Sequence, residues 1–234
     1  MIAERLRREV FHANRVLSES GLVMATFGNV SGVDREAGLF VIKPSGVPYD
    51  GLTPAEMVPV SLDDGRVLEG TLRPSSDTPT HLELYRAFDC GGIVHTHSAY
   101  ASAFAQARLP IRCMGTTHAD HFRGDVPVTR PLTPAEIAGD YERETGLVII
   151  ETFRTANLRP DEISAVLVAH HGPFTWGRDA LAAVEQARAL EYVARLEATM
   201  RAIAPDAARP DPALIDRHFL RKHGAGSYYG QKKT

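Results

Sequence analysis

The pattern of hydrophobic and polar positions predicts helices and short strands that alternate from the N-terminus onward. A first helix is indicated by apolar residues that fall on one helical face, namely Ile2, Leu6, Val10 and Leu17. Two apolar segments with glycine at their turns, 22–34 and 38–46, predict short strands. Residues 53–62 open with a capping box from Thr53 to Glu56 and then continue as an extended apolar segment.

The middle of the chain continues this alternation. A short helix is predicted over 79–88, where Pro79 is tolerated because it stands in the first turn. The apolar run at 91–97 predicts a strand, and the small residues near 98–107 predict the helix after it.

The C-terminal half begins with a second capping box, Thr133 to Glu136, which opens a helix with proline at its first position. Apolar runs at 147–153 and 164–172 predict two more strands. A long helix over about 179–203 carries one apolar side, and a proline-rich segment separates it from a last helix and the tail. Strands and helices interleaved in this way predict one mixed, layered α/β domain.

Composition narrows the class of protein. The 234 residues are 44% hydrophobic, and 26 basic against 29 acidic side chains give a formal net charge of -3, which favours no nucleic-acid partner. Two cysteines, Cys90 and Cys113, are too few for a disulfide framework, so a reducing cytosol is expected. The N-terminal residues lack a continuous apolar core, so neither a signal peptide nor a membrane span is predicted.

The segment IVHTH at 93–97 is the first candidate for chemistry. Side chains alternate along a strand, so His95 and His97 share one face, either as structural histidines or as neighbouring metal ligands. His171 follows another apolar run, and alternation allows only one of His170 and His171 to join the same site. Three imidazoles from two strand ends suit a borderline-soft ion such as zinc, with positions left open for a substrate.

Polar residues near predicted turns give two further candidates, each with two interpretations. Ser75, Ser76 and Asp77 lead into a helix, where they either cap its first turn or help to bind an anion. The motifs GNVSG and IKPSG contain common turn formers, and they also place donors suited to phosphate at Asn29, Lys43 and Ser45.

Taken together, the motifs resemble those of the class II sugar-phosphate aldolase/epimerase family, in family order from about residue 5 to residue 231. They are GNVSGVD, IKPSG, PSSDTPTHLELYRAF, GGIVHTHSAYASAFA, GTTHADHF, HHGPFTWG and RKHGAGSYYGQ. Within the family the chain most resembles the L-ribulose-5-phosphate 4-epimerases. The resemblance implies one domain over 1–234 with a central, mostly antiparallel sheet flanked by helices, and a C-terminal tail, about 210–234, that contributes to the active site.

The resemblance also implies a role for particular residues. A divalent metal ion, most simply zinc with manganese or cobalt as alternatives, would be bound by His95, His97 and His171 together with Asp77. Substrate phosphate and its surroundings would be contacted by Asn29, Lys43, Ser45, Gly46, Ser75, Ser76, His218 and Arg221. Asp120 and Tyr229 would be the acid/base pair; the alternatives are a turn residue in a loop for Asp120 and a C-terminal packing anchor for Tyr228 and Tyr229. The family further implies a homotetramer with sites at subunit interfaces.

The function implied by the resemblance is interconversion of L-ribulose 5-phosphate and D-xylulose 5-phosphate at carbon 4, by carbon–carbon bond cleavage and re-formation. Aldolases of the family carry Glu where this chain has Asp77. A carboxylate one methylene shorter favours a metal ligand over a proton acceptor, and a conservative exchange without a change of role is the alternative. Two other functions remain open: a class II aldolase of the fuculose-phosphate type, and a non-enzymatic assembly domain of the adducin type.

Overall fold

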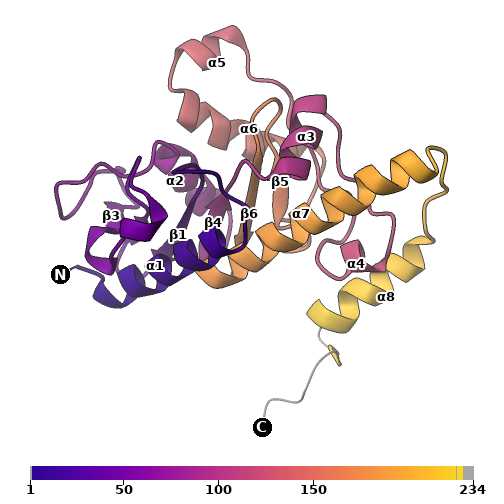
Figure 1. Ribbon diagram of the computed structural model, residues 1–234, viewed down its shortest axis with the longest axis horizontal. Coiled ribbons are helices and arrows are strands. Elements are labelled where there is room, and N and C mark those ends of the chain that lie inside the picture. The colour runs from indigo at the N-terminus through magenta and orange to yellow at the C-terminus, as the bar shows by residue number, and fades with distance from the viewer. Residues whose placement is uncertain (1, 225, 229–234) are drawn as a thin grey trace.

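The computed structural model describes residues 2–224 and 226–228, and an antiparallel sheet of six strands forms its centre (Figure 1). The strand order is β3-β2-β1-β4-β6-β5, and every neighbouring pair is antiparallel. The strands are β1 (Asn29–Asp34), β2 (Leu39–Ile42), β3 (Val58–Ser61), β4 (Gly92–His95), β5 (Ala165–Leu167) and β6 (Pro173–Gly177). This arrangement confirms the fold class expected from the family resemblance.

Helices surround the sheet, and the long helix α7 crosses the molecule before the chain turns back into α8 (Figure 1). The helices are α1 (Glu4–Glu19), α2 (Thr78–Ala87), α3 (Ala99–Ala107), α4 (Thr116–Ala119), α5 (Pro134–Ala138), α6 (Tyr141–Thr155), α7 (Ala180–Ile203) and α8 (Pro212–His223). Two short 3-10 turns, η1 (Tyr49–Gly51) and η2 (Pro54–Glu56), connect β2 to β3.

The two faces of the sheet pack against different helices because neighbouring strand residues point to opposite sides. Val94 belongs to a buried cluster with Val10 of α1 and Val184 of α7. The adjacent Ile93 belongs to a second cluster with Leu84 of α2 and Ile149 of α6. The strand that ends in His95 is therefore fixed from both sides.

One predicted strand is wrong: residues 147–153 lie inside helix α6. Short apolar runs do not distinguish a strand from a buried helix, and β-branched residues favoured the strand. In the fold, Val148, Ile149 and Phe153 are buried along one side of the helix, where α6 packs on α2. Tertiary packing has outweighed local propensity in this segment.

Close packing explains the two glycines before His95. A Cβ atom on Gly92 would lie 2.5 Å from both Cα and N of Ala180, and one on Gly91 would lie 1.9 Å from the Arg178 carbonyl oxygen. Glycine therefore lets the start of α7 approach the backbone of β4.

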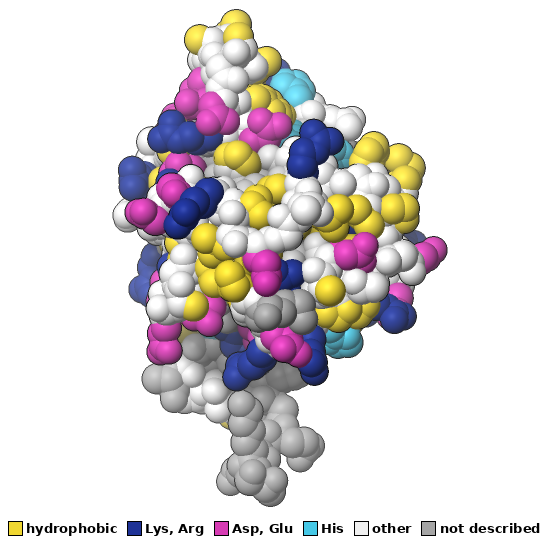
Figure 2. All heavy atoms as spheres, turned by 90° about the vertical axis from the view of Figure 1, so that its left-hand side faces the viewer, with side chains coloured by type: hydrophobic (Ala, Val, Ile, Leu, Met, Phe, Trp, Pro, Cys, Tyr) yellow, Lys and Arg dark blue, Asp and Glu magenta, His cyan; other side chains and the backbone are white. Residues whose placement is uncertain are grey.

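On the face shown in Figure 2, basic and acidic side chains are interspersed, in line with the nearly balanced charge of the chain. In the part of the chain that the structure describes, no helix has both the length and the apolar character required to cross a bilayer.

Candidate active site

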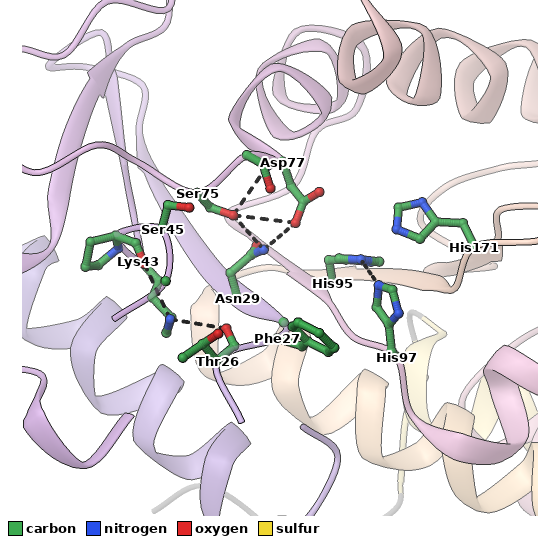
Figure 3. Close-up of a pocket in the computed structure, with 14 residues that line it drawn as sticks. Thr26, Phe27, Asn29, Lys43, Ser45, Ser75, Asp77, His95, His97 and His171 are labelled. Carbon is green, nitrogen blue, oxygen red and sulfur yellow. Dashed lines mark hydrogen bonds between the residues drawn. The ribbon is translucent and has the colours of Figure 1, made fainter. Parts of the chain in front are cut away.

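Three histidines from two chain segments converge at one end of the sheet (Figure 3). His95 is the last residue of β4, His97 follows two positions later, and His171 lies in the turn between β5 and β6. One ligand nitrogen of each lies within 4.8 Å of the others, and the Nε2 atoms of His95 and His97 are 3.1 Å apart. The expected grouping of these side chains is therefore present.

We expected His171 to lie at the end of a strand, where alternation would separate its side chain from that of His170, but His171 lies in a turn. Strand β5 ends at Leu167, and His170 has a left-handed backbone with φ of 63°. His171 therefore reaches the cluster from a turn, and alternation along a strand does not separate it from His170.

The surroundings of His97 and His171 favour the neutral form of both imidazoles. Nδ1 of His95 lies 3.0 Å from the Pro173 carbonyl oxygen, so it donates there, and Nε2 is left without a proton and with a lone pair that could bind a cation. Burial, followed by the neighbouring histidines, lowers the pKa of His171 to about 3 and also lowers the pKa of His97. Three convergent imidazoles could hold a divalent ion such as zinc.

Asp77 lines the same cavity as the three histidines. Among the described residues, however, only the histidines have possible ligand atoms that all lie within 4.8 Å of one another. Its Oδ2 accepts a hydrogen bond of 2.6 Å from Nδ2 of Asn29, which also donates to Ser75. Burial favours the protonated acid, but the positive charge that His95 and His81 carry when protonated, together with the Asn29 hydrogen bond, outweighs it, so the pKa of Asp77 is lowered. Its role as a fourth metal ligand stays a prediction.

One cavity of about 320 Å³ joins the histidine cluster to the residues expected to bind phosphate. Its lining comprises Thr26, Phe27, Gly28, Asn29, Lys43, Pro44, Ser45, Gly46, Ser75, Ser76, Asp77, His95, His97 and His171. Figure 3 shows Lys43, Ser45 and Ser75 on one side of this space and the histidines on the other. The residues expected to bind phosphate and those expected to bind a metal ion thus line the same cavity.

Lys43 is the cation of the cavity. The residue is 1% exposed, and its Nζ donates to the Val47 carbonyl oxygen at 2.7 Å and lies 4.7 Å from the centre of the Tyr49 ring. Burial lowers the pKa of Lys43 to about 8. Nζ also donates to the carbonyl oxygens of Thr26 at 3.5 Å and Pro44 at 3.4 Å, and its described hydrogen bonds and ion pairs include no carboxylate that would neutralise its charge.

The other expected active-site residues form a separate group outside this cavity. Asp120, directly after α4, accepts hydrogen bonds from Arg221 at 3.1 and 2.7 Å and from Nδ1 of His218 at 3.1 Å. Burial raises the pKa of Asp120, but these donors and the Lys222 charge outweigh burial, so the pKa is lowered. None of these residues lines the cavity of the same chain. Tyr229 lies outside the described residues, while Tyr228 is 66% exposed.

Two parts of the site were missed by reasoning from the sequence. Thr26, Phe27 and Gly28 line the cavity directly before Asn29, and their position beside that residue is the signal that could have found them. Tyr141, whose hydroxyl lies 3.3 Å from Nδ1 of His171, carried no signal because it stands far from the other site residues in sequence.

Known proteins share this fold. The sequence model of the Class II Aldolase and Adducin N-terminal domain family matches residues 8–198. An L-fuculose 1-phosphate aldolase is 26% identical with a TM-score of 0.76, over 92% of this chain and 94% of its own. L-fuculose-1-phosphate aldolase from Thermus thermophilus is 27% identical with a TM-score of 0.68, over 88% and 99% of the two chains. YgbL from Klebsiella pneumoniae is 25% identical with a TM-score of 0.71, over 93% and 99%. Since the family model spans most of the sequence, this chain belongs to the Class II Aldolase and Adducin N-terminal domain family.

Proposed function

We propose that the protein is a metal-dependent 4-epimerase that interconverts L-ribulose 5-phosphate and D-xylulose 5-phosphate. The observation that carries the proposal is the single cavity in which the histidine cluster faces Lys43 and the serine hydroxyls. A ligand with a phosphate at one end and a hydroxyketone at the other matches this division, because ammonium and hydroxyl groups bind phosphate.

His95, His97 and His171 would hold the metal ion, and Asp77 would complete its protein ligands. A divalent ion at this position would supply a Lewis acid beside the oxygens on carbons 2 and 3 of the sugar. Zinc suits three imidazoles and a carboxylate, and manganese or cobalt are the alternatives. Asn29 would hold the Asp77 carboxylate in place, since it already donates to Oδ2 at 2.6 Å.

The reaction explains why both ends of the cavity are needed. Carbon 4 is not adjacent to the carbonyl at carbon 2, so removal of its proton would not give a stabilised carbanion. Cleavage of the bond between carbons 3 and 4 avoids this problem: carbons 1 to 3 keep the electron pair as the enediolate of dihydroxyacetone, and carbons 4 and 5 leave as glycolaldehyde phosphate. The phosphate site, with Lys43, Ser45, Gly46, Ser75 and Ser76, would retain this fragment while its aldehyde turns over and the bond re-forms on the other face.

Proton transfer on the two faces requires two groups, and we assign them to Asp120 and Tyr229. Asp120 does not line the cavity of its own chain. We therefore assign it, together with the tail and with His218 and Arg221, to the site of a neighbouring subunit in a homotetramer. Hydrogen bonds from His218 and Arg221 would set the orientation of the Asp120 carboxylate there.

A class II aldolase that releases both fragments is the second candidate, and solved relatives named L-fuculose-1-phosphate aldolases support it. Asp77 favours the epimerase, because its short carboxylate is already held by Asn29 close to the imidazoles. An assembly domain of the adducin type is disfavoured by the convergent histidine cluster.

The deciding experiment is incubation of the zinc-loaded protein with L-ribulose 5-phosphate, followed by separate assays for D-xylulose 5-phosphate and free glycolaldehyde phosphate. Accumulation of xylulose phosphate without free fragments is the expected result. Release of fragments, or cleavage of L-fuculose 1-phosphate in preference, would instead support the aldolase. A protein that binds no metal and converts neither sugar would support an assembly role.

A further inference from the structure

Two histidines of the cluster, His95 and His171, each have a hydrogen-bond partner at Nδ1, but one partner is a backbone group and the other is a side chain. His95 uses the carbonyl oxygen of Pro173, a fixed backbone group, at 3.0 Å. His171 uses a side chain, the hydroxyl of Tyr141, at 3.3 Å from its Nδ1. Because this contact occupies Nδ1, Nε2 is the nitrogen of His171 that remains for a cation.

Tyr141 is held firmly, although it lies at the start of a helix. The backbone oxygen of Tyr141 accepts from the Thr145 hydroxyl at 2.9 Å, and that of the next residue, Glu142, accepts from the Thr80 hydroxyl at 2.5 Å. A Cβ atom on Gly146 would lie 2.9 Å from Cβ of Glu83, so α6 and α2 are in close contact. Helix α2, which follows Asp77 directly, therefore also fixes the first turn of α6.

The hydroxyl of a tyrosine can both donate and accept a hydrogen bond. A neutral phenol can accept the Nδ1 proton of His171 and still donate its own proton elsewhere. Tyr141 is absent from the residues that line the substrate cavity, so its action would pass through His171.

We infer that Tyr141 is a positioning residue: its hydroxyl holds His171 in the tautomer and orientation that present Nε2 to the metal ion. This inference rests on the proposed function only in that the three histidines hold a metal. Outer partners of ligating histidines typically contribute about 10- to 100-fold in metal affinity. Loss of the Tyr141 hydroxyl should therefore weaken the metal site without altering the cavity walls.

The test compares the unaltered protein with Tyr141→Phe, which removes the hydroxyl and keeps the ring, and with Tyr192→Phe, which removes a hydroxyl from an exposed tyrosine of α7. Each metal-free protein is titrated with Zn²⁺ in competition with a chromophoric chelator, and its melting temperature is measured without metal. Tyr141→Phe is expected to bind zinc about 10- to 100-fold more weakly. Its metal-free melting temperature should match that of the unaltered protein, and Tyr192→Phe should match it in both measurements.

Zinc affinity in Tyr141→Phe equal to that of the unaltered protein would overturn the inference. A fall in the metal-free melting temperature, with an unchanged gain in melting temperature on zinc addition, would also overturn it, because the hydroxyl would then be structural. The outcome is separable from the proposed reaction. A protein whose zinc affinity depends on Tyr141 but which releases fragments from the sugar refutes the epimerase and leaves this inference standing.

Discussion

If Lys43 binds the substrate phosphate as proposed, the protonation of this one side chain controls substrate affinity. It is buried, and its pKa is lowered to about 8 rather than raised, so the ammonium form is complete well below that pH and is lost above it. The KM for the sugar phosphate should therefore rise as the pH increases through about 8, while kcat changes little. Steady-state kinetics across this range on the phosphorylated sugar will measure the effect.

Lys43→Met supplies the control for that pH dependence. Loss of a charge-assisted hydrogen bond costs about 1.5–3 kcal/mol, so catalytic efficiency should fall by about one to two decades. The rise in KM near pH 8 should disappear in the variant, and its metal content should be unchanged. A variant with full efficiency and the same pH profile would show that Lys43 does not bind the phosphate.

Tyr229 and Tyr228 are adjacent, and only Tyr229 is assigned a proton-transfer role by resemblance. Tyr229→Phe removes the hydroxyl alone, and loss of a positioned acid or base typically lowers the rate by about two to four decades. Tyr228→Phe should remain close to the unaltered protein, since Tyr228 is 66% exposed. Coupled assays of D-xylulose 5-phosphate formation compare the two, and the reverse order of effects would move the role to Tyr228.

At the scale of elements, the approach of α7 to β4 depends on Gly92. Gly92→Ala would place Cβ 2.5 Å from the backbone of Ala180, and overpacking of this kind typically lowers the free energy of unfolding by about 1–3 kcal/mol. Gly51→Ala is the matched control, because no atom lies within 4 Å of its added Cβ. Urea denaturation of both variants measures the difference, and equal stability of the two would contradict the packing argument.

The same elements show how far sequence patterns predict the fold. The amphipathic spacing of Val10 and Leu17 predicted α1, and the apolar run ending in His95 predicted β4. Both predictions succeeded because the apolar positions in the sequence are the positions that are buried in the fold. The strand predicted over 147–153 was wrong, because this apolar run belongs to helix α6 and is buried against α2. The spacing of apolar residues in the sequence does not show which other element will pack against them. The prediction of a mostly antiparallel central sheet flanked by helices came from the family resemblance rather than from local pattern, and neither gave the order of the strands.

At the scale of the whole molecule, the expected site residues fall into two groups. One group lines a common cavity, and the other lies outside it. His95, His97 and His171 meet with Lys43 and the serines in one cavity, as the motifs indicated. Asp120 lies elsewhere, bound by Arg221 and His218 of α8. The position of Tyr141 behind His171 could not be predicted, because only the packing of α6 on α2 brings it there.

This division leads to a prediction about the assembly. If Asp120 acts in the cavity of a neighbouring subunit, His97→Asn and Asp120→Asn should each be nearly inactive alone but should restore activity when their subunits are mixed. An Asp120→Asn subunit supplies intact histidines, and the adjoining His97→Asn subunit supplies Asp120. With random reassociation in a ring of identical interfaces, about one quarter of the sites contain both intact groups. The mixed protein should therefore recover up to about a quarter of the unaltered activity after mild dissociation and reassociation.

Light scattering of each variant before and after mixing verifies that the assemblies have re-formed. A mixture of two His97→Asn preparations, treated in the same way, controls for recovery caused by the procedure itself. No recovery in the hybrid, with assemblies intact, would mean that Asp120 and the histidines serve the same subunit. Asp120 would then have to move from its contacts with Arg221 and His218 to reach the cavity, and the interface arrangement proposed for the site would be wrong.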